Sequence, residues 1–258
     1  MTINRRKFLK LSAVSAGSVL TAGLIYRLTR PSDPLHDFYK STEKVLRAHF
    51  GKERAAGIMG EVRANHASLI PSVPYIGGKE NIFTEWLTYG VYYLAVYRVL
   101  KPLGCSMNQI GEMIYKTYED MADYPKWFLR IVGKLKYGKS YTSRLRLAAE
   151  ESQKRHYPDS WVCSFVKGDG HEFDYGLDIA ECGIWKFYVA HNAQELGPYM
   201  CLSDYVVSKA FDKGLVRHHT IAERGDRCDF RYKKGQETFV YPLRNGWPPG
   251  SSINVDSI

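Results

Sequence analysis

The pattern of apolar residues changes near Asp159, and this change limits the folds that the chain can adopt. After Asp159, β-branched and aromatic residues dominate 161–166, and 173–180 alternate in polarity, as in a half-buried strand. Before it, apolar side chains recur at intervals of three and four, the period of an α-helix. The predicted helices are 37–50, 53–69, about 81–100, 107–120, 124–132 and 140–155. We therefore predict an α+β fold, with the helical N-terminal half packed on a small, mainly antiparallel sheet.

The C-terminal half is predicted to carry two helices inserted between its strands. They are 183–193 and 199–211, separated by Gly197 and Pro198. After them, 217–223 and 228–233 are predicted as a strand pair joined by a turn at 224–227.

We expect one domain over 37–235, helical in 37–157 and α+β in 158–235. Residues 31–36 contain two prolines and are predicted to be a linker. Residues 236–258 are predicted to be an irregular tail.

Residues 1–30 have the pattern of an export signal. Arg5 and Arg6, followed by Lys7-Phe8-Leu9, match the twin-arginine consensus. The apolar run 11–26 is short and rich in Gly, Ser and Ala, unlike an ordinary membrane span. We expect export through the twin-arginine (Tat) translocation machinery to a periplasmic or other extracytoplasmic location. The signal is then either cleaved near Gly23 or kept as a membrane anchor.

The net charge of +9 at first favours an anionic partner such as nucleic acid. Residues 1–30, however, contain six basic residues and no acid, which leaves a net charge of three for the rest of the chain. Because that value is ordinary, we predict no nucleic-acid partner. Any contact with a membrane is expected through the uncleaved signal alone.

Three of the five cysteines, Cys182, Cys201 and Cys228, are the leading candidates for chemistry. In the predicted helix 199–211, Cys201 and Asp204 are three residues apart and share a face. A thiol near a helix N-terminus has a lowered pKa and can act as a nucleophile, and a neighbouring carboxylate can transfer a proton. In the alternative interpretation, Cys201 is buried and Asp204 caps the helix or faces water.

The last predicted strand places Cys228 and Arg231 on opposite faces. A guanidinium can bind a carboxylate through two parallel hydrogen bonds, so Arg231 is a candidate anchor for a substrate. The alternative is an ion pair with a nearby acid such as Glu223. Glu181 and Glu195 are the remaining acid–base candidates.

The cysteine spacing is not that of a known metal or haem site, because no C-x-x-C pair is present. The chain also lacks a phosphate-binding glycine loop, a G-x-S-x-G elbow and an H-E-x-x-H motif. We therefore predict no cofactor. A metal held by the three thiols with a histidine or aspartate is the alternative.

Several residues of the C-terminal half match the pattern of a known family. They are Glu181-Cys182, Glu195-Leu196, Pro198, Cys201, Asp204, Arg217, Thr220, Gly225 and Cys228-Asp229-Phe230-Arg231. This pattern resembles the L-2-amino-thiazoline-4-carboxylic acid hydrolase family over about residues 80–235. Members are associated with opening the ring of L-2-amino-thiazoline-4-carboxylate to give N-carbamoyl-L-cysteine.

The resemblance implies a set of roles in such a reaction. Cys201 or Cys228 would be the nucleophile or a polarising group, and Asp204 or Glu195 would transfer the proton. The substrate carboxylate would be anchored by a guanidinium. The residues expected to bind substrate are Arg217, Arg231, Cys182 and Thr220.

The expected function is that of an exported hydrolase of non-peptide C–N bonds in a small cyclic amidine or amino-acid-like substrate. Two alternatives stay open at this point. One is a periplasmic module that binds a small ligand or a metal, and the other is an accessory protein of an exported redox complex.

Overall fold

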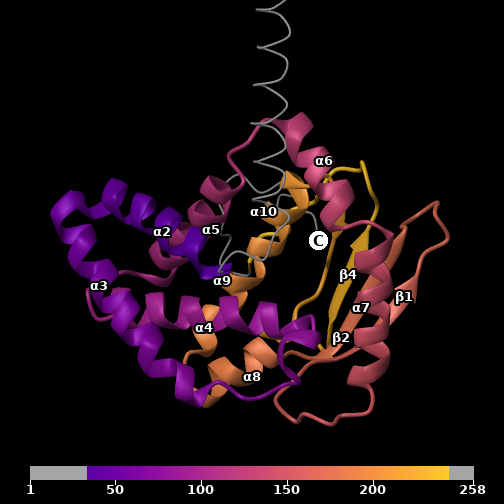
Figure 1. Cartoon of the computed structure of the whole chain (residues 1–258), viewed down its shortest axis with the longest axis horizontal. Coiled ribbons are helices and arrows are strands. Elements are labelled where there is room, and N and C mark those ends of the chain that lie inside the picture. Colours follow the sequence, from indigo (N-terminus) through magenta and orange to yellow (C-terminus); the bar gives the residue numbers. More distant parts are fainter. Residues whose placement is uncertain (1–33, 244–258) are drawn as a thin grey trace, which may run out of the picture.

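The computed structural model describes residues 34–243. The predicted signal, 1–30, and the end of the predicted tail, 244–258, lie outside the described residues. Helices fill the N-terminal part of the described chain (Figure 1). They are α2 (Pro34–Phe50), α3 (Lys52–Leu69), α4 (Phe83–Leu100), α5 (Met107–Met121), α6 (Lys126–Lys136) and α7 (Lys139–Ser152).

The C-terminal part of the described chain combines a four-stranded sheet with short helices. The strands are β1 (Val162–Lys167), β2 (Tyr175–Glu181), β3 (Leu215–Val216) and β4 (Cys228–Tyr232). Between β2 and β3 lie α8 (Gly183–Ala190), α9 (Gly197–Cys201) and α10 (Ser203–Ala210). Short 3-10 helices at Ile70–Ser72, Gly78–Glu80, Gln194–Leu196 and Ile221–Glu223 complete the described elements.

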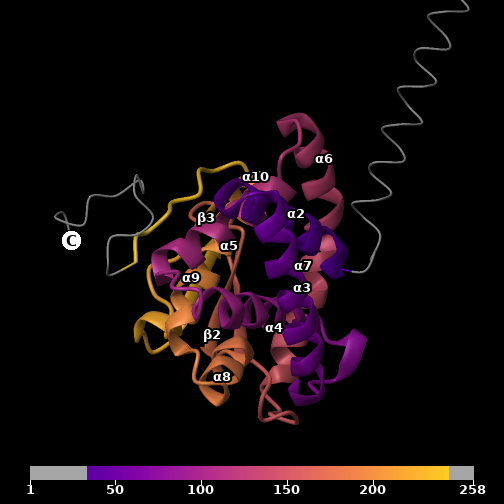
Figure 2. The same cartoon turned by 90° about the vertical axis from the view of Figure 1, so that its left-hand side faces the viewer.

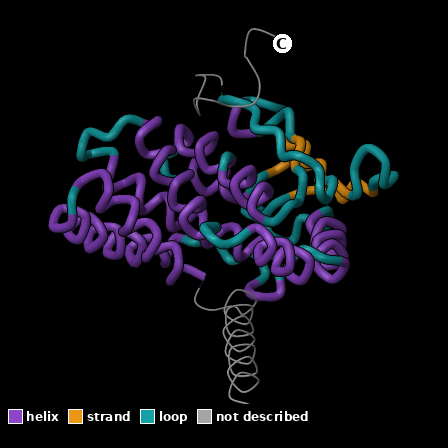
Figure 3. The backbone as a smooth tube through the Cα atoms, turned by 90° about the horizontal axis from the view of Figure 1, so that it is seen from above, coloured by secondary structure: helices purple, strands orange, loops and turns teal. Residues whose placement is uncertain are grey.

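The sheet has the order β1-β2-β4-β3, and each neighbouring pair is antiparallel. The predicted α+β class is therefore confirmed, including helices inserted between the strands. Viewed from above, the strands lie toward one end of the molecule and many of the helices toward the other (Figure 3). Helix α7 packs against β1, so the sheet is joined to the helical half.

Helix α4 is the central element of the core. Three consecutive residues, Tyr92, Tyr93 and Leu94, are all buried, which requires contacts on more than one side of the helix. Helix α3 packs on it from one direction and α8 from another (Figure 2). At Gly90 a Cβ atom would come within 2.9 Å of Ile184 Cγ1, so the absence of a side chain there allows α8 to approach closely.

Three sequence predictions are corrected by the backbone. Helix α2 begins at Pro34, so the predicted linker is wrong over 34–36; proline fits a first helical turn because its missing N–H has no intrahelical partner there. The predicted helix 199–211 is divided at Leu202 into α9 and α10. The predicted strand 217–223 is a loop that ends in a 3-10 helix, whose N-terminus is capped by Thr220.

The predicted turn at 224–227 is not a tight hairpin turn, since β3 ends at Val216 and the longer segment 217–227 joins it to its neighbour β4. It follows the 3-10 helix, and Arg224 adopts a left-handed backbone with φ of 67°.

Residues 236–243 have no regular structure, as predicted, but they pack against the rest of the protein. Thr238 is buried and its hydroxyl donates to Ser208 Oγ at 3.0 Å.

Within residues 34–243, no helix has both the length and the apolar character needed to cross a bilayer.

Candidate active site

A large cavity of about 2160 Å³ separates parts of the helical half from the sheet. Residues of α4, α7, α9, α10 and β4 contribute to its lining, together with the segment that connects β2 to α8. Aromatic rings form much of one wall: Phe83 stacks on Trp161 with centroids 5.3 Å apart, and Trp86 meets Trp161 edge to face at 6.0 Å. Such a wall suits a flat, partly apolar ligand.

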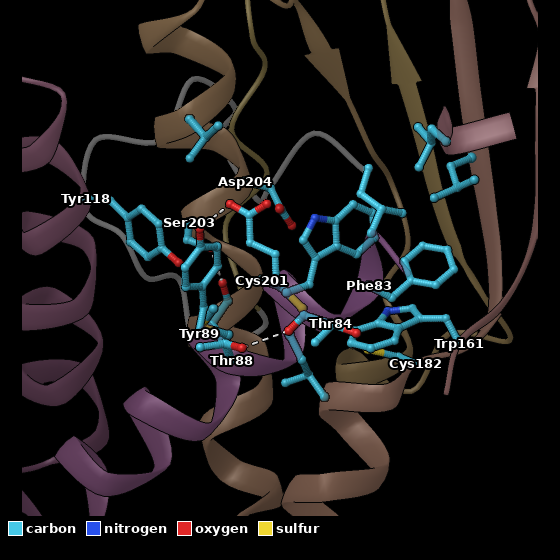
Figure 4. Close-up of a pocket in the computed structure, with 18 of the residues that line it drawn as sticks. Phe83, Thr84, Thr88, Tyr89, Tyr118, Trp161, Cys182, Cys201, Ser203 and Asp204 are labelled. Atoms are coloured by element: carbon cyan, nitrogen blue, oxygen red, sulfur yellow. Dashed lines mark hydrogen bonds between the residues drawn. The ribbon is translucent and has the colours of Figure 1, made fainter. Parts of the chain in front are cut away.

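Cys182, Cys201 and Cys228 all line this cavity. Strand pairing explains part of this convergence, because β2 and β4 are neighbours and Ile179 lies opposite Cys228, close to where β2 leads into Cys182. Figure 4 shows Cys182 and Cys201 on the cavity wall near Trp161 and Asp204. All five cysteines are free thiols, and the other two are buried outside the cavity lining.

The environment of the three thiols keeps them protonated. Burial, together with the nearby Cys228, raises the pKa of Cys182 to about 12. Burial also raises the pKa of Cys201 well above its usual value, although the charge of Arg217 opposes this effect. Cys201 is the last residue of α9, so it does not occupy the helix N-terminus that was expected to lower its pKa. At neutral pH these groups are therefore thiols and not thiolates.

Asp204, in the first turn of α10, is held by a buried arginine. Arg217 is only 2% exposed, and its Nη1 lies 2.6 Å from Asp204 Oδ2. Its Nη2 donates to the carbonyl oxygen of Cys201 at 2.9 Å. The guanidinium also packs against the rings of Tyr205 and Phe230, at 4.7 and 4.9 Å from the two centroids. Arg217 thus fixes the backbone at Cys201 and the carboxylate at Asp204 together.

The carboxyl group of Asp204 is available to a ligand in the cavity. Its side chain is 40% exposed, and Asp204 belongs to the cavity lining whereas Arg217 does not. The exposed part of the side chain faces the cavity and the surrounding protein separates it from bulk water. This desolvation raises the pKa of Asp204 above its usual value, and the charge and hydrogen bond of Arg217 oppose the rise. A carboxyl group with a raised pKa exchanges a proton more readily near neutral pH than an ordinary aspartate does.

The remaining predicted site residues lie away from the cavity lining. Arg231 is on the other face of β4, where its Nη1 pairs with Asp178 at 2.7 Å, so its position does not support the predicted role as an anchor. Glu195 accepts from Tyr97 at 2.7 Å and pairs with Lys101 at 2.9 Å.

Thr220 caps a 3-10 helix through the N–H of Glu223. Glu181, a further acid–base candidate, is paired with Lys186 and Arg155, which lower its pKa.

Two parts of the cavity, the aromatic wall and the lysine Lys213, were not predicted from the sequence. Trp86 lies on an apolar helix, where no local pattern distinguishes a core residue from one that faces a cavity. Lys213 lies in a polar turn that resembles an exposed loop. Within residues 34–243, no group of three or more potential metal ligands is present. The prediction that the protein needs no cofactor remains a prediction.

The family model for L-2-amino-thiazoline-4-carboxylic acid hydrolase matches residues 89–232, more than half of the chain. The chain belongs to this family. No curated protein matches, and no solved structure matches either. In this family member, the matched region includes the three cavity thiols, Asp204 and Arg217, while Phe83 and Trp86 of the aromatic wall precede it.

Proposed function

We propose that this protein hydrolyses a small cyclic amidine with an amino-acid-like carboxylate, and that the cavity is its active site. The observation that carries the proposal is the Asp204 carboxyl group, which Arg217 holds at the wall of a cavity lined by aromatic rings and neutral thiols. Membership of the hydrolase family supports the reaction class. L-2-Amino-thiazoline-4-carboxylate, named by the family, is the first substrate to test.

Ring opening requires an oxygen to be added at the amidine carbon. A water molecule forms a C–O bond to that carbon, and one of its protons passes to the Asp204 carboxylate. The other proton of the water ends on the ring nitrogen, which becomes the N–H of the product, and the added oxygen becomes a carbonyl oxygen. In the thiazoline, the bond from the same carbon to the ring sulfur then breaks, and the departing sulfur takes up the proton from Asp204. The product is N-carbamoyl-L-cysteine, which keeps both C–N bonds of the amidine carbon. The bond hydrolysed in this substrate is therefore C–S, and not the C–N bond expected from the sequence. These reaction steps need a single carboxyl group that can both accept and donate a proton.

The thiols have a supporting role in this scheme. Because Cys182 and Cys201 are protonated, they are poor nucleophiles at neutral pH. Cys228 Sγ accepts from the backbone N–H of Ile221 at 3.3 Å, and burial raises the pKa of its thiol. We assign these three side chains to a polarizable wall beside the reacting sulfur.

Turnover in ¹⁸O-labelled water tests the proposal directly. Purified full-length protein is mixed with L-2-amino-thiazoline-4-carboxylate, and both the new free thiol and the mass of the product are followed. The scheme predicts one ¹⁸O atom in the carbamoyl group and one free thiol for each ring opened. Absence of turnover with the thiazoline and with related cyclic amidines would refute the proposed function.

We also propose that the protein is exported through the twin-arginine machinery and works outside the cytoplasm, on the basis of Arg5 and Arg6. Cell fractionation of the full chain tests this: the double variant Arg5→Lys/Arg6→Lys should stay in the cytoplasm, and unchanged export would refute the proposal.

A further inference from the structure

Lys213 is a cation inside the cavity that the proposed chemistry does not use. Its ammonium contacts aromatic rings: Nζ lies 4.3 Å from the centroid of Tyr137, 4.5 Å from that of Tyr232 and 5.9 Å from that of Tyr141. Within residues 34–243, no acid forms an ion pair with it. Rings stabilise an ammonium partly, but they cannot replace the anion or the water that a buried cation requires.

The backbone around Lys213 is fixed, so the position of the ammonium is built into the fold. The N–H of Lys213 donates to Ser208 O at 3.0 Å, which ties the turn to the end of α10. The N–H of Lys233 donates to Gly214 O at 2.8 Å, and that of Gly235 to Asp212 O at 3.0 Å. These bonds tie the same turn to the end of β4. A side chain on such a turn is positioned more accurately than one on a free loop.

The other basic groups near the cavity are less suited to hold an anionic ligand. Arg217 is engaged by Asp204 and Cys201, and Arg231 is engaged by Asp178 on the other face of the sheet. The remaining basic side chains on the lining are exposed, and three of them also pair with acids: Lys44 with Asp120, Arg47 with Glu43 and Arg155 with Glu181. Lys213 is the half-buried exception among the described lining residues.

We propose that Lys213 binds the carboxylate of the substrate and so orients the ring with its amidine carbon toward Asp204. The inference rests on the proposed function, because it assigns the amidine end of the ligand to Asp204 and the carboxylate end of the same ligand to Lys213. It replaces the predicted arginine anchor by a lysine, and it restricts the substrates to small anionic molecules. A carboxylate that meets a poorly hydrated ammonium forms a charge-assisted hydrogen bond.

The pH dependence follows from the environment of the ammonium. Burial lowers the pKa of Lys213 to about 8, while the charge of Asp204 acts to raise it and that of Lys136 to lower it. The titratable groups that contact its ammonium or act on its charge come from α6, α7, α10, β4 and the turn after α6: Lys136, Tyr141, Asp204, Tyr232 and Tyr137. Glu85 of α4 acts in turn on Lys136, Tyr137 and Tyr141. Burial raises the pKa of each of the three tyrosines, so these phenols stay neutral while Lys213 titrates. Because the protonated form binds the anion, KM for a carboxylate substrate should rise above about pH 8.

The experiment compares Lys213→Met with Lys213→Arg and with Lys233→Met. Lys233 is a matched control, since it is a half-buried lysine that lies outside the cavity lining and pairs with Asp174. For L-2-amino-thiazoline-4-carboxylate, Lys213→Met should raise KM about 10- to 100-fold, the equivalent of one lost charge-assisted hydrogen bond. Lys213→Arg should restore part of the loss. For 2-amino-thiazoline, which lacks the carboxylate, wild type and Lys213→Met should have the same KM.

A binding measurement separates this inference from the proposed function. L-Thiazolidine-4-carboxylate and thiazolidine, which lack the amidine, are titrated calorimetrically into each variant, and circular dichroism verifies the fold. Loss of binding of the carboxylate alone in Lys213→Met supports the inference even if no protein sample turns over the thiazoline. Equal KM and equal affinity in wild type and Lys213→Met would overturn the inference while leaving a measured hydrolase activity in place.

Discussion

At the scale of single residues, the same residue type has different roles depending on what surrounds it. Arg217 and Arg231 each pair with an aspartate at similar distances, 2.6 and 2.7 Å. Asp204 faces the cavity, whereas Asp178 lies on the other face of the sheet. A sequence pattern that contains both arginines does not distinguish them. Strand alternation distinguishes them in part, because it places the side chain of Arg231 on the face of β4 that does not carry Cys228.

Cys201 illustrates how burial decides reactivity. The sequence placed it near the start of a long helix, where a thiolate would be favoured, but the helix is divided at Leu202. Its thiol lines the cavity, and burial raises the pKa of the thiol. A covalent mechanism through Cys201 would need a base to remove its proton at the moment of attack.

The first prediction follows from this protonated state. Iodoacetamide at pH 7 should modify Cys201 and Cys182 more slowly than it modifies a free cysteine, and the rate should increase toward pH 10 as thiolate forms. Peptide mass spectrometry after timed quenching gives the rate for each site. Modification of Cys201 at pH 7 at least as fast as that of free cysteine would show that it is an activated nucleophile.

At the scale of elements, close contacts between helices position the cavity residues. Helix α5 packs on α9 through Gly111, where a Cβ atom would lie 2.1 Å from Tyr199 Cδ1. The Tyr199 ring is held in place because its hydroxyl donates to Asn108 Oδ1 at 2.6 Å. Since α9 ends at Cys201, this contact also determines where one of the cavity thiols lies.

The second prediction tests that contact. Gly111→Ala should lower the free energy of unfolding by about 1–3 kcal/mol, because the methyl group overpacks the α5–α9 interface. Gly57→Ala is the matched control: it lies in α3 with open space around the added Cβ, so it should raise stability by about 0.5–1 kcal/mol. Urea unfolding of both variants gives the two values. A Gly111→Ala protein as stable as Gly57→Ala would contradict the proposed packing.

At the scale of the whole molecule, the sequence was enough to predict the class of fold and the approximate position of the longer helices. Periodicity identified α3, α4 and α5 within a few residues, since each has several buried positions at helical spacing. The short elements after Ala210 were less predictable. Segment 217–220 lies beside β4, and the N–H of Asp229 donates to the carbonyl oxygen of His219 at 3.4 Å, but the regular pairing of β3 with β4 ends at Val216.

The candidate site was predictable only in part. The family pattern indicated Cys201, Asp204 and Cys228, and the structure brings these three to one cavity. Lys213 was missed because a lysine between aspartate and glycine is typical of an exposed turn. Its burial depends on tyrosines from α7 and β4 that lie far away in the sequence. Such long-range packing has no local sequence signal.

The central claim is that the cavity around Asp204 is the active site. The most direct test is to measure kcat/KM for ring opening in Asp204→Asn and in Asp178→Asn, each referred to the folded fraction measured by circular dichroism. Both changes remove one carboxylate from an aspartate–arginine pair, but only Asp204 lines the cavity. We predict a loss of about 100-fold or more in Asp204→Asn, as expected for removal of a general acid–base group, and a change of less than about 3-fold in Asp178→Asn. Equal activity in the two variants would contradict the claim.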